Sequence, residues 1–266
     1  MPRFSTLELE CSDRGVTTLW LNRPEKNNAF NGQMVDELHA ALGEVAAPGH
    51  TRLLLLRGRG KHFSAGADLA WMQASARLSY EENVLEARTL GELMDHLYRL
   101  PMPTLAVVHG AAFAGAMGLV SCCDMAIGSE DAVFSLAEVR LGLAPAVISP
   151  YVVQAIGQRA ARRYTLTAER FDAQRAVELG LLAQAYPRPQ LEAGVDTWTL
   201  NLLNNGPAAM AACKALLLEV GDGTVTAALK ARTQHTIAEL RTGSEGQEGM
   251  KAFFEKRAPA WQGGAA

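Results

Sequence analysis

The stretch VHGAAFAGAMGLVSCCDMAIGSEDAVFSLAEVRLGLAPAVISP, residues Val108–Pro150, is apolar enough for a core but uses Gly and Ala where a core would use Leu and Ile. Small residues let a ligand approach backbone N–H groups that a Cβ would screen. Glu138 is the one carboxylate in the apolar run from Ala132 to Val139. Apolar surroundings raise the pKa of such a carboxyl toward the range useful for proton transfer. This stretch therefore predicts an oxyanion-binding site with an acid/base group beside it.

Residues on the N-terminal side alternate between strand-like and helix-like patterns. Period-two alternation and short apolar runs, of which LLLL at 53–56 is the clearest, predict strands at Thr6–Glu10, Val16–Asn22, Arg52–Arg57, Thr104–His109, Met125–Gly128 and Val133–Ser135. Apolar residues at helical spacing predict helices at Asn31–Val45, Tyr80–Leu100 and Ala114–Cys123. Together they predict an α/β fold with a mostly parallel sheet covered by helices.

From about Ser149 onward the pattern is helical only. Helices are expected at Pro150–Gly157, Arg159–Leu166, Ala173–Gly180, Gln190–Leu203, Pro207–Val220, Thr224–Leu240 and Glu245–Lys256. A helical end of this kind often supplies an oligomer interface. No internal repeat or long linker marks independent domains.

Composition narrows the class of protein. The 266 residues are 48% apolar and 20% charged, which is typical of a globular chain with a large core. A net charge of −3 provides no basic surface for nucleic acid or anionic lipid, so neither partner is expected. The first residues lack the pattern of a signal or transit peptide, which favours a cytoplasmic location. Buried free thiols are expected for Cys11, Cys122, Cys123 and Cys213, which form no C-x-x-C pair.

Several sequence blocks, in order along nearly the whole chain, resemble those of the crotonase superfamily, the enoyl-CoA hydratases and isomerases. They are LNRPEKNNAFN (21–31), GRGKHFSAGADLAWM (58–72), HGAAFAGAMGLVSCCDMAI (109–127), FSLAEVRLGLAP (134–145) and EGMKAFFEKR (248–257). The resemblance implies the crotonase (ClpP-like spiral) fold, with a catalytic core over residues 1–200 and a helical trimerisation region over 201–266. Among family members, the chain looks most similar to bacterial 3-methylglutaconyl-CoA hydratases.

The resemblance also implies three catalytic positions. The N–H groups of Ala67 and Gly115 would hold the thioester oxygen, and Glu138 would move a proton at Cα or activate water at Cβ. The LLLL strand leads into FSAGADL, so the 65–67 loop should present N–H groups at a strand end. A helix beginning near Gly115 adds unpaired N–H groups and the positive end of its dipole.

Further residues are candidates for binding the substrate or for packing. Trp71 and Met72 are candidates for the wall of the acyl pocket, or equally for the core. His109 matches no metal spacing, no metal site is expected, and His109 is expected to pack or to bond a backbone group. The positions that match CoA contacts are Lys26, Ala65, Gly66, Asp68 and Leu69, with Phe253 and Lys256 contributed by a neighbouring subunit.

One position departs from the family pattern. Well-studied hydratases carry a second glutamate three residues after the oxyanion glycine, and this chain has Gly118 there. Two carboxylates suit hydration, whereas one suits a 3,2-enoyl-CoA isomerase that shuttles a single proton. Glu138 acting through one water, the substrate's own carboxylate, or Glu86 are three ways to supply the second role. Arg140 is a weaker candidate for binding a substrate carboxylate than for pairing with a protein carboxylate.

The resulting expectation is an enoyl-CoA hydratase, with 3-methylglutaconyl-CoA of leucine breakdown as the favoured substrate. No metal or redox cofactor is expected, since CoA is part of the substrate, and a homotrimer or a hexamer of two trimers is expected. The alternatives are the isomerase, a hydratase for a longer branched glutaconyl thioester, and a non-catalytic acyl-CoA- or RNA-binding protein. The RNA-binding alternative requires a lysine-rich helix, and the Asn31–Val45 helix contains no lysine.

Overall fold

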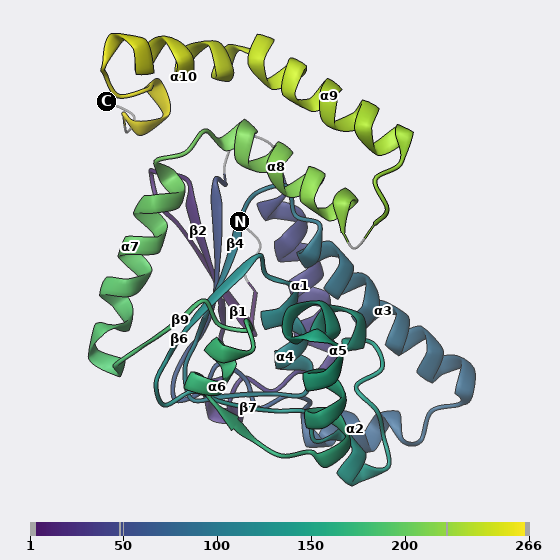
Figure 1. Ribbon diagram of the computed structural model, residues 1–266. Helices are drawn as coiled ribbons and strands as arrows, with labels where there is room; N and C mark the ends of the chain where they lie inside the picture. The colour runs from purple at the N-terminus through teal and green to yellow at the C-terminus, as the bar shows by residue number, and fades with distance from the viewer. Residues whose placement is uncertain (1–3, 48, 50, 222, 264–266) are drawn as a thin grey trace.

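A six-stranded sheet forms the centre of the computed structural model, which describes residues 4–47, 49, 51–221 and 223–263 (Figure 1). The first pair of strands is antiparallel and every later pair is parallel. The sheet order is β1 (Leu7–Cys11), β2 (Val16–Leu21), β3 (Leu53–Gly58), β4 (Thr104–Val108), β6 (Met125–Ser129) and β9 (Gln184–Tyr186). The predicted α/β fold is confirmed.

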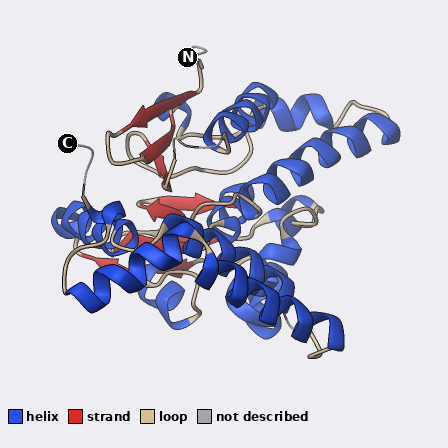
Figure 2. Cartoon of the chain, turned by 90° about the horizontal axis from the view of Figure 1, so that it is seen from above, coloured by secondary structure: helices blue, strands red, loops and turns tan. Residues whose placement is uncertain are grey.

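Helices cover both faces of this sheet, as Figures 1 and 2 show. On one face lie α1 (Gly32–Val45), α3 (Tyr80–Tyr98) and α4 (Gly115–Cys122). On the other face α7 (Leu191–Leu203) packs against the apolar side chains of β3, β4 and β6. Because both faces are covered, the four leucines of β3 are all buried, which is why this strand reads as a continuous apolar run.

A second, three-stranded sheet was not expected as such. It contains β5 (Ala111–Phe113), β7 (Val133–Ser135) and β8 (Phe171–Asp172), with β5 and β7 parallel. The stacked rings of Phe134 and Phe171, 5.3 Å apart, join β7 to β8. The strands β8 and β9 show that the prediction of helices only beyond Ser149 is wrong.

Two helical details also differ from expectation. The segment after β3, where no helix was expected, contains the short helix α2 (Leu69–Ser75). The two helices predicted on either side of Gly157 form one helix, α5 (Ser149–Thr167), which is kinked at Gly157, where φ is 76°. The next helix is α6 (Ala173–Glu178). No helix in the described ranges is both long and apolar enough to cross a membrane.

The last three helices, α8 (Pro207–Val220), α9 (Ala227–Thr242) and α10 (Ser244–Glu255), form an arm that lies along one end of the core (Figure 1). Buried Lys214 of α8 fastens the arm, since its Nζ lies 2.8 Å from Oδ2 of Asp124 and donates to the carbonyl of Met102. The break between α7 and α8 falls at residues 204–206.

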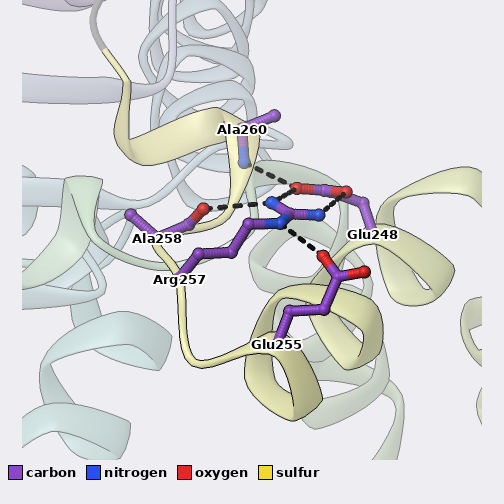
Figure 3. Close-up of polar contacts among 5 residues, drawn as sticks. All are labelled: Glu248, Glu255, Arg257, Ala258 and Ala260. Atoms are coloured by element: carbon purple, nitrogen blue, oxygen red, sulfur yellow. Dashed lines mark hydrogen bonds and ion pairs between the residues drawn. The ribbon is translucent and has the colours of Figure 1, made fainter.

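The chain after α10 folds back toward this helix and is held there by hydrogen bonds around Arg257 (Figure 3). The guanidinium of Arg257 donates two hydrogen bonds to Glu248, of 2.6 and 2.9 Å, and one to Glu255, while Glu248 also accepts the N–H of Ala260. The hydrogen bonds from Arg257, followed by the one from Ala260, hold the pKa of Glu248 at about 2.

This fold-back brings the C-terminal residues onto the core. The guanidinium of Arg52 donates to the carbonyls of Trp261 and Leu203, at 3.1 and 2.8 Å. Arg52, directly before β3, therefore bonds the chain just before the arm and the chain just after it.

Candidate active site

Three chain segments run side by side toward one edge of the structure. Ser64 pairs in parallel with Ala112, and Phe113 of the same strand pairs in parallel with Ser135 of β7. The N–H of Phe113 donates to the carbonyl of Ser64, and the N–H of Ala114 donates to that of Ser135. Parallel neighbours end at the same edge, so Ala67, Gly115 and Glu138 follow three segments that end at one edge of the structure.

Hydrogen bonds on both sides of Ala67 set the direction of its N–H. Phe30 donates to the carbonyl of Gly66 and accepts from the N–H of Asp68, both at 2.7 Å. In an extended segment the residue between two such bonds points its own N–H the other way, here away from Phe30. Within the described part of the chain, no acceptor takes the N–H of Ala67.

Gly115 is the first residue of α4. Ala114 before it has the unusual backbone angles φ 50° and ψ −121°, which turn the chain from β5 into the helix. First-turn N–H groups have no partner inside a helix, and the helix dipole adds positive charge there. A Cβ on Gly115 would lie 3.0 Å from the ring of Phe30, so a glycine suits this position. Two N–H groups are thus free to bind one oxygen.

Glu138 begins a 3-10 turn, Glu138–Leu141, three residues beyond β7. Its carboxylate is half-buried, and its Oε2 atom is buried without a hydrogen-bond partner among the described residues. Burial raises the pKa of this carboxyl above its ordinary value, although the backbone N–H of Glu138 opposes the rise. A carboxylate in this state suits proton transfer.

At Gly118, where well-studied hydratases carry the second glutamate, neighbouring side chains occupy the space that a side chain would need. A Cβ on Gly118 would collide with Cγ2 of Ile148, would lie 2.9 Å from Cβ of Ile148, and would reach 3.3 Å from Cε of Met94. Ile148 is buried and immediately precedes α5. Gly118 is therefore needed for α4 to meet the start of α5.

Glu86, the candidate for a replacement acid, is engaged elsewhere. One of its carboxylate oxygens accepts the indole N–H of Trp71 at 2.5 Å, which joins α2 to α3. Trp71 is half-buried and packs against the main core, and Met72 beside it is also half-buried. Their place in the acyl pocket remains a prediction.

Two other side chains have identified partners. Arg140 donates to the carbonyl of Ala168 at 2.9 Å, so the expectation that it pairs with a protein carboxylate is wrong. His109 is buried and its Nε2 lies 3.0 Å from the carbonyl of Gly60, which confirms the expected backbone bond.

All four cysteines are free thiols. The expectation that they are buried is confirmed for Cys122 and wrong for Cys11 and Cys213, which are exposed, while Cys123 is half-buried.

The residues expected to bind CoA differ in their surroundings. Lys26 and Leu69 are exposed, and the N–H of Ala65 donates to the carbonyl of Asn27 beside Lys26. Gly66 has a φ of +92° and lies against Phe113, so its role is close packing of the loop on β5. Asp68 pairs with Arg23 and caps α2 through the N–H of Ala70.

A cavity of about 470 Å³ lies beside Ala65. Lys61 and Arg170 bring positive charge to its wall, which also contains the neutral amide of Asn27 and the carboxylate of Asp131. Sequence reasoning missed Lys61 although it lies in the GRGKHFSAGADL block, four residues before Ala65. It also missed Arg170, which only the fold brings near.

Phe253 and Lys256 lie far from this edge of the same chain. Figure 1 shows α10 and α2 at opposite ends of the molecule. The side chain of Phe253 is exposed, and Lys256 ends α10 in a left-handed conformation. Within one chain they do not join the site formed by Ala67, Gly115 and Glu138.

Comparisons with known proteins find relatives along nearly the whole chain. The family model for enoyl-CoA hydratase/isomerase matches residues 12–264. A Thermus thermophilus protein, provisionally named as an enoyl-CoA hydratase, is 35% identical over 92% of this chain and 96% of its own. An enoyl-CoA hydratase structure from Shewanella pealeana superposes with a TM-score of 0.93 at 46% identity, covering 97% of both chains. A Legionella pneumophila structure, titled as an enoyl-CoA hydratase/isomerase, gives 0.91 at 43% identity, over 97% of this chain and all of that one.

Proposed function

This chain belongs to the enoyl-CoA hydratase/isomerase family, and on that premise we propose that it adds water reversibly to a 2-enoyl-CoA, preferably 3-methylglutaconyl-CoA in leucine catabolism. The observation that supports this most is one edge with two free N–H groups, of Ala67 and Gly115, and the unpaired carboxylate oxygen of Glu138. A cytoplasmic location is part of the proposal.

The two N–H groups bind the thioester oxygen of the substrate. As negative charge develops on that oxygen, each donor stabilises the enolate by about 3 kcal/mol. Ala67 and Gly115 supply these donors from rigid backbone, so no side chain has to reorganise during the reaction.

Glu138 supplies the proton chemistry. Its carboxylate takes a proton from water as the hydroxyl adds to Cβ of the substrate, and the resulting acid returns that proton to Cα. One water is consumed, the carboxylate is regenerated, and no separate cofactor enters the balance because CoA arrives with the substrate.

A second candidate reaction is 3,2-enoyl-CoA isomerisation. The filled space beside Gly118 favours it, because Ile148 leaves no room for a second acid at that position. In this reaction Glu138 would take a proton from Cα of a 3-enoyl thioester and return it to Cγ. For hydration, Glu138 serves both roles through one water, or the distal carboxylate of the glutaconyl group assists.

CoA binding extends the site along the loop before α2. Lys26, Ala65 and Leu69 contact the nucleotide and pantetheine in this proposal, and the charges of Lys61 and Arg170 suit its phosphates. Phe253 and Lys256 of a neighbouring copy complete the binding site, since neither reaches it within one chain. The assembly is then a homotrimer or a hexamer of two trimers.

Ultraviolet absorbance of the conjugated thioester tests the proposal. The three substrates are 3-methylglutaconyl-CoA, crotonyl-CoA and a 3-enoyl-CoA. Loss of absorbance much faster with the methylglutaconyl substrate than with crotonyl-CoA is expected. A gain of absorbance with the 3-enoyl substrate alone would replace hydration with isomerisation.

A further inference from the structure

Arg23 and Asp68 form an ion pair next to the proposed oxyanion site. Nη2 of Arg23 lies 3.0 Å from Oδ2 of Asp68, and both side chains are only 14% exposed. Nη1 of the same guanidinium donates to the carbonyl of Ala29 at 2.6 Å. One rigid, planar group therefore bonds two separate chain segments.

These two segments are the ones that hold Ala67. Ala29 directly precedes Phe30, whose backbone brackets Ala67 through hydrogen bonds with Gly66 and Asp68. Asp68 directly follows Ala67. Arg23 thus ties together both sides of the short bridge that directs the N–H of Ala67.

Hydrogen bonds also hold the backbone of Arg23 in place. The N–H of Arg23 donates to the side chain of Asn28 at 2.8 Å, and the fully buried Asn28 amide donates to the carbonyls of Arg59 and His62. The guanidinium therefore extends from an anchored backbone.

Both carboxylate oxygens of Asp68 already accept hydrogen bonds from this chain. Its Oδ2 binds Arg23, and its Oδ1 accepts the N–H of Ala70 as the N-cap of α2. These contacts give Asp68 a role in fixing the backbone beside it.

We infer that Arg23, acting through Asp68 and Ala29, is a positioning residue that aims the N–H of Ala67 at the thioester oxygen. The inference rests on the proposed function only in placing a thioester oxygen between Ala67 and Gly115. Stabilisation by fixed donors depends steeply on geometry, so a small rotation of this N–H weakens the transition state more than it weakens substrate binding.

The direct probe is 4-dimethylaminocinnamoyl-CoA, whose absorption moves to longer wavelength when hydrogen bonds polarise its carbonyl. The wild-type protein is expected to shift this band. Arg23→Gln should reduce the shift and lower kcat about 10–100-fold, with KM changed less than about threefold. Arg23→Lys, which keeps the charge but not the two-pronged donor, should fall between Arg23→Gln and wild type.

Arg163→Gln provides the matched control, because Arg163 pairs with Glu169 on the surface. It should keep the full band shift and full kcat. Circular dichroism monitors folding of each variant, and if Arg23→Gln does not fold, Arg23→Lys and Asp68→Asn replace it.

The possible outcomes separate the two proposals. A full band shift and normal kcat in folded Arg23 variants would overturn the positioning role. A raised dissociation constant for free CoA in Asp68→Asn, with an unchanged shift, would return Asp68 to CoA binding and also overturn it. If the wild-type protein gives no band shift, the oxyanion site itself is wrong, and the proposed function fails first.

Discussion

At the scale of single residues, the burial of Glu138 links activity to stability. The carboxylate form is disfavoured by burial in the folded state, so a neutral amide of the same shape removes a cost. Glu138→Gln is expected to lower kcat by about 10²–10⁴-fold and to leave the Tm at pH 7 unchanged or higher. Steady-state kinetics and calorimetry measure the two effects; near-wild-type turnover would show that Glu138 is not the base.

The same residue predicts a pH dependence. The pKa of Glu138 is raised in the folded state above its unfolded value, so its favourable contribution to stability is present below the unfolded value and is lost as pH rises through the folded value. Activity needs the carboxylate, so the acid limb of kcat/KM should lie above the usual range of a glutamate. The limb should be absent from the residual activity of Glu138→Gln; a limb within the ordinary range would contradict the burial seen here.

Gly118 and Gly43 form a matched pair of helical glycines. A Cβ at 118 meets buried Ile148, whereas a Cβ at 43, on α1, meets nothing within 4 Å. Gly118→Ala is expected to lower the free energy of unfolding by about 1–3 kcal/mol. Gly43→Ala should raise it by about 0.5–1 kcal/mol. Urea denaturation measures both changes. If the two variants gave the same change, the side chain of Ile148 would be able to move aside at little cost, contrary to the prediction.

Much of the candidate site could be predicted because its residues lie in short local motifs. Ala67, Gly115 and Glu138 each follow a strand, and parallel strands deliver them to one edge. The role of Arg23 could not be predicted, because its partner Asp68 is 45 positions away and only the fold brings the two together. Nor does the identity of Gly118 reveal that Ile148 occupies the space beside it.

At the scale of elements, long periodic helices were predictable, and the short strand Val133–Ser135 was also found, but other very short strands were not. Pro207–Val220 is observed with the predicted bounds, because a 14-residue helix shows its period in its own sequence. Strands such as Phe171–Asp172 and Gln184–Tyr186 are too short to show alternation. Their conformation depends on pairing with strands already in place, which is tertiary information.

The attachment of α8 also depends on a contact that sequence does not show. Lys214 and Asp124 pair where the lysine is almost fully buried. Removing the lysine leaves the carboxylate without its charge partner, so Lys214→Ala should lower the free energy of unfolding by about 3 kcal/mol. Lys230→Ala, at an exposed lysine on α9, should change it by less than about 0.5 kcal/mol. A similar decrease in the free energy of unfolding in both variants would show that the buried Lys214–Asp124 pair does not stabilise the attachment of α8.

At the scale of the whole molecule, the arm presents apolar side chains that its own chain leaves uncovered. Phe253 and Phe254 of α10 are each 77% exposed, and their rings touch edge to face. If a second copy covers them, Phe254→Asp should lower the sedimentation mass to that of a monomer and raise KM for the acyl-CoA. Leu166→Asp, at an exposed leucine on α5, should retain the assembly. A wild-type monomer in sedimentation would contradict the proposed trimer.

The order of strands in the main sheet has a consequence for how the protein is made. Each strand lies beside the strand that precedes it in the sheet-forming part of the chain, so during translation every new strand meets a neighbour that has already left the ribosome. The contact from Arg52 to Trp261, 209 positions apart, is necessarily among the last to form. The strands of the core sheet are therefore all synthesised before the arm can be seated.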